Sequence, residues 1–258
     1  MLKNIINIKN KIKTKKAIIG IIGLGYVGYP LAINFAKKQF KVIGFDNDPK
    51  KIRKIKDGGK IFEHIKDKVK LKNFIPTSKF SHITSCDIII ICVPTPLLLK
   101  KKVPDLSYIK SAVDSILPFL RKGQFISLES TSYPGTTEEL IVKKIKKKFN
   151  IGKDIFVSFS PEREDPARSF KMTEIPKVIS GSTKNCLVVS EIVYRSIFKH
   201  LHPVSSTKVA EFTKLLENIY RSVNIGLINE MKIISKIFKI NIFEAIEAAK
   251  TKPFGFRS

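Results

Sequence analysis

The chain has 258 residues, 43% of them hydrophobic and 27% charged, a balance that is typical of globular proteins and excludes an intrinsically disordered body. Its 48 basic and 22 acidic side chains give a formal net charge of +26. Such a charge indicates a polyanionic partner, namely nucleic acid or an anionic membrane, or else a lysine-rich coding bias. Three cysteines exclude a disulfide scaffold and a multi-cysteine zinc module, and they favour the reducing cytoplasm.

The chain starts with a basic segment that is followed by a long uncharged one. We interpret residues 1–16 as a frayed basic leader. Residues 17–36 carry no formal charge and are long enough to span a bilayer. Their four glycines, Pro30 and Asn34 instead favour a buried strand, a tight turn and the first half of a helix. We therefore expect no membrane segment.

Strand-like and helical patterns then alternate along the chain. Residues 87–93 form an almost purely apolar run, which is typical of a strand buried on both faces of a parallel sheet. The pattern predicts strands over 17–22, 41–45, 87–93, 124–128, 155–159 and 178–179, and helices over 27–38, from Pro49 onward, and over 107–120, 136–149, 185–198, 205–239 and 242–250. This alternation predicts an α/β fold with a doubly wound parallel sheet.

The pattern changes after Val204, where one long helix replaces the alternation. We therefore predict a Rossmann-type nucleotide-binding domain over residues 17–204 and a helical segment over residues 205–258.

Residues 23–28 read Gly-Leu-Gly-Tyr-Val-Gly and lie between a predicted strand and a predicted helix. In a G-x-G-x-x-G turn, Gly23 makes the tight turn, Gly25 lets the backbone approach a pyrophosphate, and Gly28 lets helix and strand pack closely. The next strand ends at Asp46, where a carboxylate would hydrogen-bond a ribose and repel a 2′-phosphate. The turn therefore predicts NAD rather than NADP; the alternative is a glycine turn that binds nothing.

Several longer segments, taken together, resemble the UDP-glucose/GDP-mannose dehydrogenase family of nucleotide-sugar 6-dehydrogenases. They are IIGLGYVGYPLA (21–32), CVPTPL (92–97), LESTSYPGTTEE (128–139), SPEREDP (160–166), IPKVISG (175–181), PVSSTKVAEFTKLLENIYRSVNIGLINEM (203–231) and TKPFGF (251–256). The resemblance covers nearly all of residues 17–256. SPEREDP and the run after His202 favour the subgroup that acts on UDP-N-acetylglucosamine for surface polysaccharide synthesis over the subgroup that acts on UDP-glucose.

The resemblance implies a two-step oxidation in which a C6 alcohol becomes an aldehyde and then, through a cysteine thioester, a carboxylate, while two NAD+ are reduced. A thiolate captures the aldehyde as a covalent intermediate. A lysine and an asparagine stabilise the developing oxyanion, and a carboxylate and a threonine hold or activate water.

Carried over by motif, the lysine and asparagine are Lys214 and Asn218, which are four residues apart and so project from one face of a helix. The resemblance makes Thr131 the water-holding threonine and Glu162 the substrate-side glutamate. The plainer alternatives are an ordinary surface lysine, a strand-end cap and a solvated loop acid that pairs with Arg163.

For the cofactor, the resemblance adds Thr95 in the loop beside NAD and Lys51 as a basic group near the adenosine. Members that act on UDP-glucose carry a second glutamate after the first, but the spacing differs here, so neither Glu164 nor Asp165 is assigned. The cofactor-binding residues that we expect are Gly23, Gly25, Tyr26, Val27, Gly28, Asp46, Lys51, Thr95, Ser130 and Thr131. We expect no metal site.

The family's nucleophilic cysteine follows the Lys-Pro-Phe-Gly-Phe signature, in a loop that ends Gly-Gly-His-Cys-Ile-Pro, whereas this sequence reaches Phe256 and stops at Ser258. We therefore expect this chain to lack the nucleophile and the C-terminal UDP-binding domain. Cys86, Cys92 and Cys186 do not match the motif, and we predict that they are small buried hydrophobic residues.

Four interpretations stay open from the sequence. The chain is a truncated enzyme, one half of a split enzyme whose C-terminal half is encoded separately, a module that binds NAD without turnover, or a basic nucleic-acid binder. The densest basic run, residues 143–148, has no aromatic stacking platform and favours a solvated helix face over a nucleic-acid site. The resemblance also implies a UDP-sugar substrate and a homodimer formed through the helix at 205–239.

Overall fold

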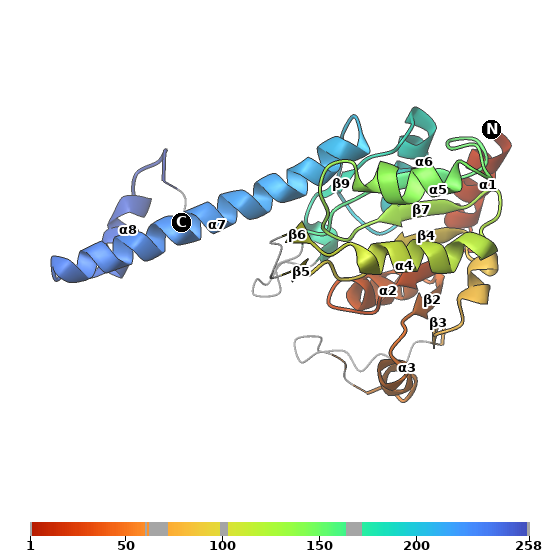
Figure 1. Ribbon diagram of the computed structural model, residues 1–258, viewed down its shortest axis with the longest axis horizontal. Coiled ribbons are helices and arrows are strands. Elements are labelled where there is room, and N and C mark those ends of the chain that lie inside the picture. Colours follow the sequence, from red (N-terminus) through yellow and green to blue (C-terminus); the bar gives the residue numbers. More distant parts are fainter. Residues whose placement is uncertain (1, 60, 62–71, 99–102, 164–171, 257–258) are drawn as a thin grey trace. The chain divides into compact units, whose positions relative to one another are not determined.

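The computed structural model describes residues 2–59, 61, 72–98, 103–163 and 172–256 (Figure 1). The chain forms two compact units, Met1–Lys214 and Leu215–Ser258. The helices are α1 (Leu2–Lys13), α2 (Gly28–Lys37), α3 (Pro49–Lys56), α4 (Ser107–Ile116), α5 (Lys143–Ile145), α6 (Lys184–Tyr194), α7 (Thr207–Ile237) and α8 (Ile242–Lys250), with the short helical turns η1 (Phe80–Ser85), η2 (Leu117–Phe119), η3 (Thr137–Val142, a π-helix) and η4 (Met172–Glu174).

The first unit is built on a six-stranded parallel sheet with the strand order β3-β2-β1-β4-β7-β8. Its strands are β1 (Ile18–Ile22), β2 (Lys41–Phe45), β3 (Phe74–Thr77), β4 (Ile88–Ile91), β7 (Phe125–Leu128) and β8 (Phe156–Phe159). The chain winds outward from β1 to one edge and returns to β4 on the other side of β1, so the winding direction reverses between these two strands. This is the strand order of the dinucleotide-binding fold, and it confirms the predicted doubly wound α/β class.

Two small sheets lie outside the main one. β9 (Lys177–Ile179) pairs in parallel with β10 (Leu201–Pro203), and β5 (Leu97–Leu98) pairs in antiparallel with β6 (Val103–Pro104). The strand that we predicted over 178–179 therefore exists but does not join the main sheet.

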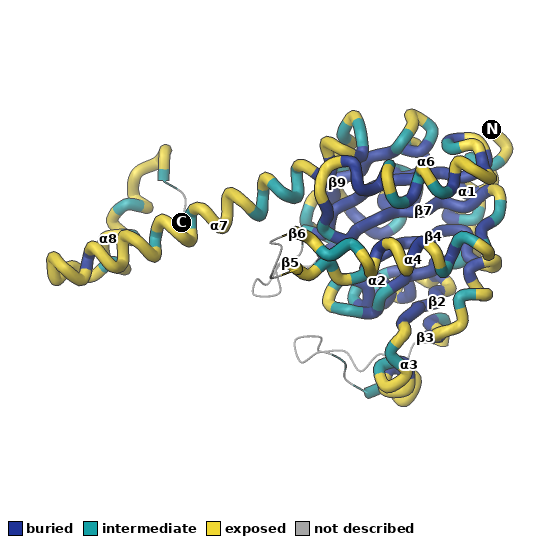
Figure 2. Tube along the Cα trace, viewed as in Figure 1, coloured by how far each residue is buried: buried dark blue, intermediate teal, exposed yellow. Residues whose placement is uncertain are grey.

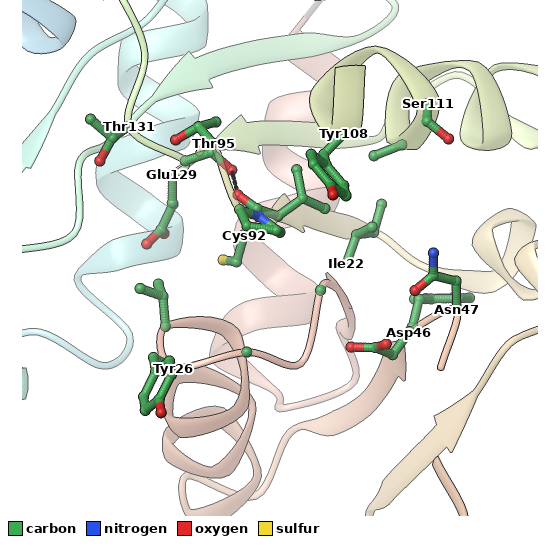
Figure 3. Close-up of a pocket in the computed structure, with 18 of the residues that line it drawn as sticks. Ile22, Tyr26, Asp46, Asn47, Cys92, Thr95, Tyr108, Ser111, Glu129 and Thr131 are labelled. Atoms are coloured by element: carbon green, nitrogen blue, oxygen red, sulfur yellow. Dashed lines mark hydrogen bonds between the residues drawn. The ribbon is translucent and has the colours of Figure 1, made fainter. Parts of the chain in front are cut away.

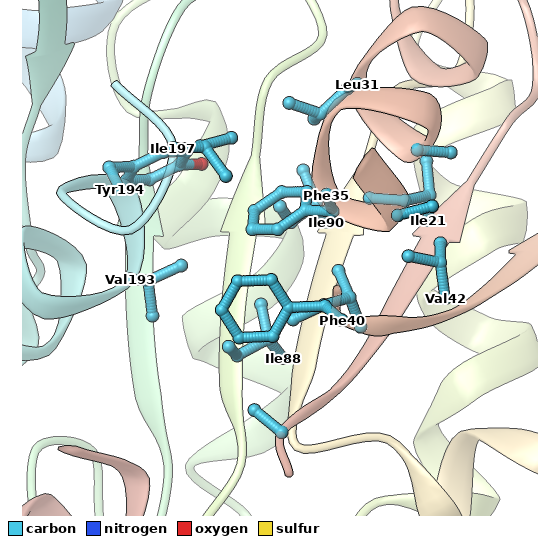
Figure 4. Packing of buried hydrophobic residues seen from close by; sticks show 14 of the residues in the cluster. Ile21, Leu31, Phe35, Phe40, Val42, Ile88, Ile90, Val193, Tyr194 and Ile197 are labelled. Atoms are coloured by element: carbon cyan, nitrogen blue, oxygen red, sulfur yellow. The ribbon is translucent and has the colours of Figure 1, made fainter. Parts of the chain in front are cut away.

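Alternation along the strands supplies a hydrophobic core on each face of the sheet. In β4, Ile88 and Ile90 point to one face and Ile89 and Ile91 to the other, because successive residues of a strand face opposite sides. The first face is covered by α1, α2, α3 and α6, and part of its core is shown in Figure 4. The second face is covered by η1, α4 and the helical run from η3 to α5. The strands are the most deeply buried part of this unit (Figure 2).

The structure of the first residues differs from what we expected from the sequence. Residues 2–13 are not frayed, because they form α1, which packs its Ile8 and Ile12 into the core of the first face. The Lys11 ammonium nitrogen also lies 2.7 Å from the buried Asp87 Oδ1. These isoleucines are spaced four residues apart, so they lie on one face of the helix, and their burial stabilises it. The many lysines of this segment had instead suggested that it is exposed to solvent.

The second unit consists of the later part of α7 together with α8, whose first turn is capped by the Asn241 side chain. It exposes many large apolar side chains, among them Leu216, Ile219, Val223 and Ile237, which are all more than half exposed. No helix in the described part of the chain combines the length and the apolarity needed to cross a membrane.

Candidate active site

The carboxyl ends of β1, β2, β4 and β7 surround a cleft of about 560 Å³ in the first unit (Figure 3). It lies at the point where the winding of the sheet reverses, between β1 and β4. Ligands of open α/β sheets bind at such a point because the loops that follow the two central strands diverge there. The cleft is therefore where the fold itself predicts a ligand.

The three glycines of the 23–28 turn have three different environments. Gly23 has φ +89°, and a Cβ there would lie 2.7 Å from the Cys92 carbonyl oxygen. A Cβ on Gly28 would lie 1.9 Å from the Gly23 carbonyl oxygen, so α2 can approach the turn only with glycine at this position. A Cβ on Gly25 would meet no heavy atom of the described chain within 4 Å. The turn is thus closed behind Gly23 and Gly28 and open at Gly25, as a pyrophosphate requires.

The N-terminus of α2 opens at the same place. Val27, its N-cap residue, makes no side-chain capping hydrogen bond in the described structure, and the first turn contains no acidic residue. The first amide groups of a helix have no partner within the helix and carry a partial positive charge. These amides therefore suit the negatively charged diphosphate of a dinucleotide.

At one end of the cleft, the buried carboxylate of Asp46 follows β2. Its Oδ2 accepts hydrogen bonds from the Leu24 amide at 2.9 Å and from Lys51 Nζ at 2.7 Å, and its Oδ1 accepts one from the Asp48 amide at 3.0 Å. These contacts fix the carboxylate at the edge of the cleft. Lys51 lines the cleft as well, and the expected contact of both residues with the adenosine part of the cofactor stays a prediction.

The other end of the cleft is formed by the loops after β4, β7 and β8 together with α7. The Ser130 hydroxyl donates to the Val93 carbonyl at 2.7 Å and thereby joins two of these loops. Lys214 Nζ donates to the backbone carbonyl of Glu162 at 2.6 Å, so the helix and the third loop are also tied together. Thr131 lies beside them on the wall of the cleft (Figure 3).

The cleft therefore brings together most of the residues that the sequence singled out. They are Gly23, Gly25, Tyr26, Val27, Asp46, Lys51, Thr95, Ser130, Thr131, Glu162 and Lys214. Gly28 packs behind the turn rather than on the cleft. Asn218 belongs to the second unit, where Arg221 Nη2 donates to its Oδ1 at 2.7 Å, and its role stays a prediction. Glu164 and Asp165 lie outside the described residues.

Sequence reasoning missed a buried charged cluster under the cleft. Lys177 Nζ lies 2.8 Å from Glu129 Oε2 and 2.7 Å from Glu162 Oε2, and the Tyr194 hydroxyl donates to Glu129 Oε1 at 2.6 Å. Burial raises the pKa of Glu129, although Lys177 opposes the shift. Burial alone would lower the pKa of Lys177, but the two carboxylates raise it above its ordinary value. A glutamate directly after an apolar strand was the available signal.

All three cysteines are buried, as we expected. Burial raises the pKa of the Cys86 thiol to about 12 and also raises that of Cys186. Cys92 lines the cleft, but burial and the nearby Glu129 hold the pKa of its thiol well above the ordinary value. Within the described ranges, no group of three or more His, Cys, Asp or Glu side chains is placed to hold a metal ion.

The strand order, the glycine turn and the acid after β2 define a dinucleotide-binding domain of the Rossmann type. Residues 17–199 match the NAD binding domain of the UDP-glucose/GDP-mannose dehydrogenase family, and residues 208–258 match the central domain of the same family. The chain belongs to the UDP-glucose/GDP-mannose dehydrogenase family, which confirms the resemblance, and its expected cofactor, NAD, is the one that the matched domain binds.

Three relatives illustrate the similarity. The chain is 39% identical over 239 residues to Protein CapL of Staphylococcus aureus, and 38% identical over 243 residues to a UDP-N-acetyl-D-glucosamine 6-dehydrogenase of Pseudomonas aeruginosa. Each match covers 91% of this chain and 56% of the relative. A solved UDP-D-ManNAc dehydrogenase from Pyrococcus horikoshii superposes with a TM-score of 0.85 at 34% identity, covering 92% of this chain and 58% of the other. The chain thus spans a little over half the length of these relatives.

Proposed function

We propose that this chain takes part in the NAD-dependent oxidation of a nucleotide sugar at C6, with UDP-N-acetylglucosamine as the substrate and surface polysaccharide synthesis in the cytoplasm as the setting. One observation supports it most strongly: a single cleft is lined at one end by the glycine turn and Asp46 and at the other by Thr131, Glu162 and Lys214. A site for a dinucleotide and a set of acid–base residues are therefore continuous with each other.

The residues of the cleft have separate roles in binding and in proton transfer. The amides of the 23–28 turn and of the start of α2 hold the diphosphate, and Asp46 accepts hydrogen bonds from the adenosine ribose. Bound NAD+ supplies the acceptor for the hydride that leaves C6. Glu162 accepts the proton of the C6 hydroxyl, Thr131 orients that hydroxyl or a water molecule, and the Lys214 ammonium stabilises the negative charge that develops on the oxygen.

We assign the first oxidation, from alcohol to aldehyde, to these residues. The thioester step of the second oxidation needs a thiolate, and the buried thiols of Cys86, Cys92 and Cys186 have raised pKa values that keep them protonated at neutral pH. None of the three therefore suits that step. In keeping with the expected homodimer, the apolar side chains exposed along α7, such as Leu216 and Val223, offer a surface that a second copy would cover.

The test is NADH formation by the purified chain with UDP-N-acetylglucosamine, UDP-N-acetylmannosamine or UDP-glucose, with hydroxylamine present to trap the aldehyde. We expect the fastest formation with UDP-N-acetylglucosamine and its loss in Lys214→Met. The matched control is Lys208→Met, which replaces an exposed lysine of the same helix and should leave the rate of NADH formation unchanged. If NAD+ binds but no sugar yields NADH, even after adding a polypeptide that supplies the family's cysteine loop, the assigned activity is wrong.

A further inference from the structure

The charged cluster under the cleft joins four separate segments of the chain. Lys177 lies on β9, Glu129 follows β7, Glu162 follows β8 and Tyr194 ends α6. The side chains of Lys177, Glu129 and Glu162 are 2%, 0% and 8% exposed. Both glutamates line the cleft. The Tyr194 hydroxyl also lies 2.8 Å from Ser127 Oγ, so the far side of the cluster is closed by hydrogen bonds within the core.

Stability alone does not explain such a cluster. Removing an ammonium and two carboxylates from water costs free energy that their mutual attraction barely repays, and well-packed apolar residues are commonly as stabilising. Buried charges that line a cleft are instead frequent in functional sites, where charge and geometry must be controlled. The place of the cluster, with both Glu129 and Glu162 lining the cleft, points in the same direction.

Glu162 is held at several of its atoms. Lys177 Nζ contacts its Oε2 at 2.7 Å, and the Arg163 amide donates to its Oε1 at 2.9 Å. From the other side, Lys214 Nζ donates to its backbone carbonyl at 2.6 Å. Lys177 Nζ also contacts the second carboxylate, that of Glu129, at 2.8 Å. Lys177 therefore sets both the charge and the separation of the two acids.

Without that ammonium, two carboxylates would face each other in a buried site. Two negative charges that share one buried site disfavour each other's ionisation. One of the two carboxyl groups would therefore take up a proton at a higher pH than in the presence of Lys177. The proton would be shared by the pair, and Glu162 would spend part of its time protonated and unable to accept another proton.

We propose that Lys177 is a positioning residue of the cleft, whose buried ammonium keeps Glu162 ionised and directs its carboxylate toward the bound substrate by holding it together with Glu129. The proposal rests on the proposed function only where it names Glu162 as the proton acceptor. The assignment of Lys177 itself rests on the contacts in the cluster.

The experiment follows the carboxyl groups of the full chain by NMR, with carbon-13 introduced at the glutamate side chains, in the wild type and in Lys177→Met. We expect the titration of the Glu129 and Glu162 pair to move upward by about one pH unit or more in the variant. Lys199→Met is the matched control, because it removes the same charge from an exposed lysine 3.6 Å from the exposed Glu174 and should leave the pair unchanged. An unchanged pair in a folded Lys177→Met would overturn the proposal.

Two further variants separate charge from structure. Lys177→Met/Glu129→Gln removes one acid together with the ammonium, so the titration of Glu162 should return toward its wild-type position. Lys177→Arg keeps the charge and should behave like the wild type. If Lys177→Met does not fold, Glu129→Gln and the double variant still decide, because they differ only in the ammonium. The titration of Glu162 should lie at higher pH in the double variant than in Glu129→Gln, and equal titrations would overturn the proposal.

The final readout is the pH profile of NADH formation, which should shift with the NMR titration in Lys177→Met and recover in the double variant. Absence of NADH formation in every variant, the wild type included, would count against the proposed function but leave the titration result for Lys177 standing. A normal pH profile in a variant whose carboxyl titration has shifted would contradict the link between Lys177 and the proton acceptor.

Discussion

Two isoleucines of α1 provide a matched test of the fold. Ile8 is 1% exposed and lies in the core of the first face, whereas Ile6, on the same helix, is 49% exposed. Replacement of either by alanine removes the same atoms and changes the helix propensity equally. Ile8→Ala should lower the free energy of unfolding by about 2–5 kcal/mol, because it leaves a cavity in the core. Ile6→Ala should stay within about 0.5 kcal/mol of the wild type.

Urea unfolding of the full chain, followed by circular dichroism, measures both variants under the same conditions. The difference between them isolates burial, because composition, charge and helix position are nearly the same. Equal midpoints for Ile8→Ala and Ile6→Ala would show that α1 does not pack as described, and the interpretation of this segment as a leader would then stand. A loss of stability in Ile6→Ala alone would refute the assigned face of the helix.

Three further predictions concern charge and access. Asp46→Ala should weaken NAD+ binding in calorimetric titration by roughly tenfold and reduce the preference over NADP+, because a charged hydrogen bond to the ribose is lost; an unchanged preference would contradict this role. Burial would raise the pKa of Asp87, but hydrogen bonds from Lys11 and Arg121 hold it below its ordinary value. Its carboxylate therefore stabilises the fold at neutral pH, and this contribution is lost as the pH falls through the lowered pKa. Thermal melts of Asp87→Asn should show a lower midpoint at neutral pH and a flatter acid dependence, and parallel curves would count against the assignment. The three thiols should react with Ellman's reagent only as the chain unfolds, since all are buried and that of Cys86 has a pKa of about 12; rapid reaction of the folded chain would show that they are accessible.

Burial on both faces explains which elements could be predicted from the sequence. β1 and β4 are continuous apolar runs, and β2 is apolar after its first residue, Lys41, so composition and length suffice to locate them. β3 was missed because it is short, lies at the sheet edge and contains Pro76. Proline has no backbone N–H to donate to a neighbouring strand, so it argues against a strand in the sequence. The helix expected over 136–149 is interrupted by the π-helical turn η3, whose hydrogen-bond pattern leaves no mark in hydrophobic periodicity.

In the site, too, residues whose role depends on sequence neighbours could be predicted, whereas residues whose role depends on distant segments could not. The glycine turn and Asp46 were found because their chemistry depends on residues close together in the sequence. Lys177 was missed because its role depends on Glu129 and Glu162, which reach it from loops after two other strands. In a chain with 48 basic residues, nothing local distinguishes a buried lysine from a solvated one.

The central claim is that the open turn at Gly25 binds the diphosphate of NAD. Calorimetric titration with NAD+ of the wild type and of Gly25→Val tests it most directly, because a Cβ at this position would meet no described heavy atom of the protein within 4 Å and would point into the space assigned to the ligand. We expect the wild type to bind NAD+ and Gly25→Val to lose binding while its urea midpoint stays unchanged. A folded wild type that does not bind NAD+, or a Gly25→Val chain that binds it equally tightly, would contradict the account.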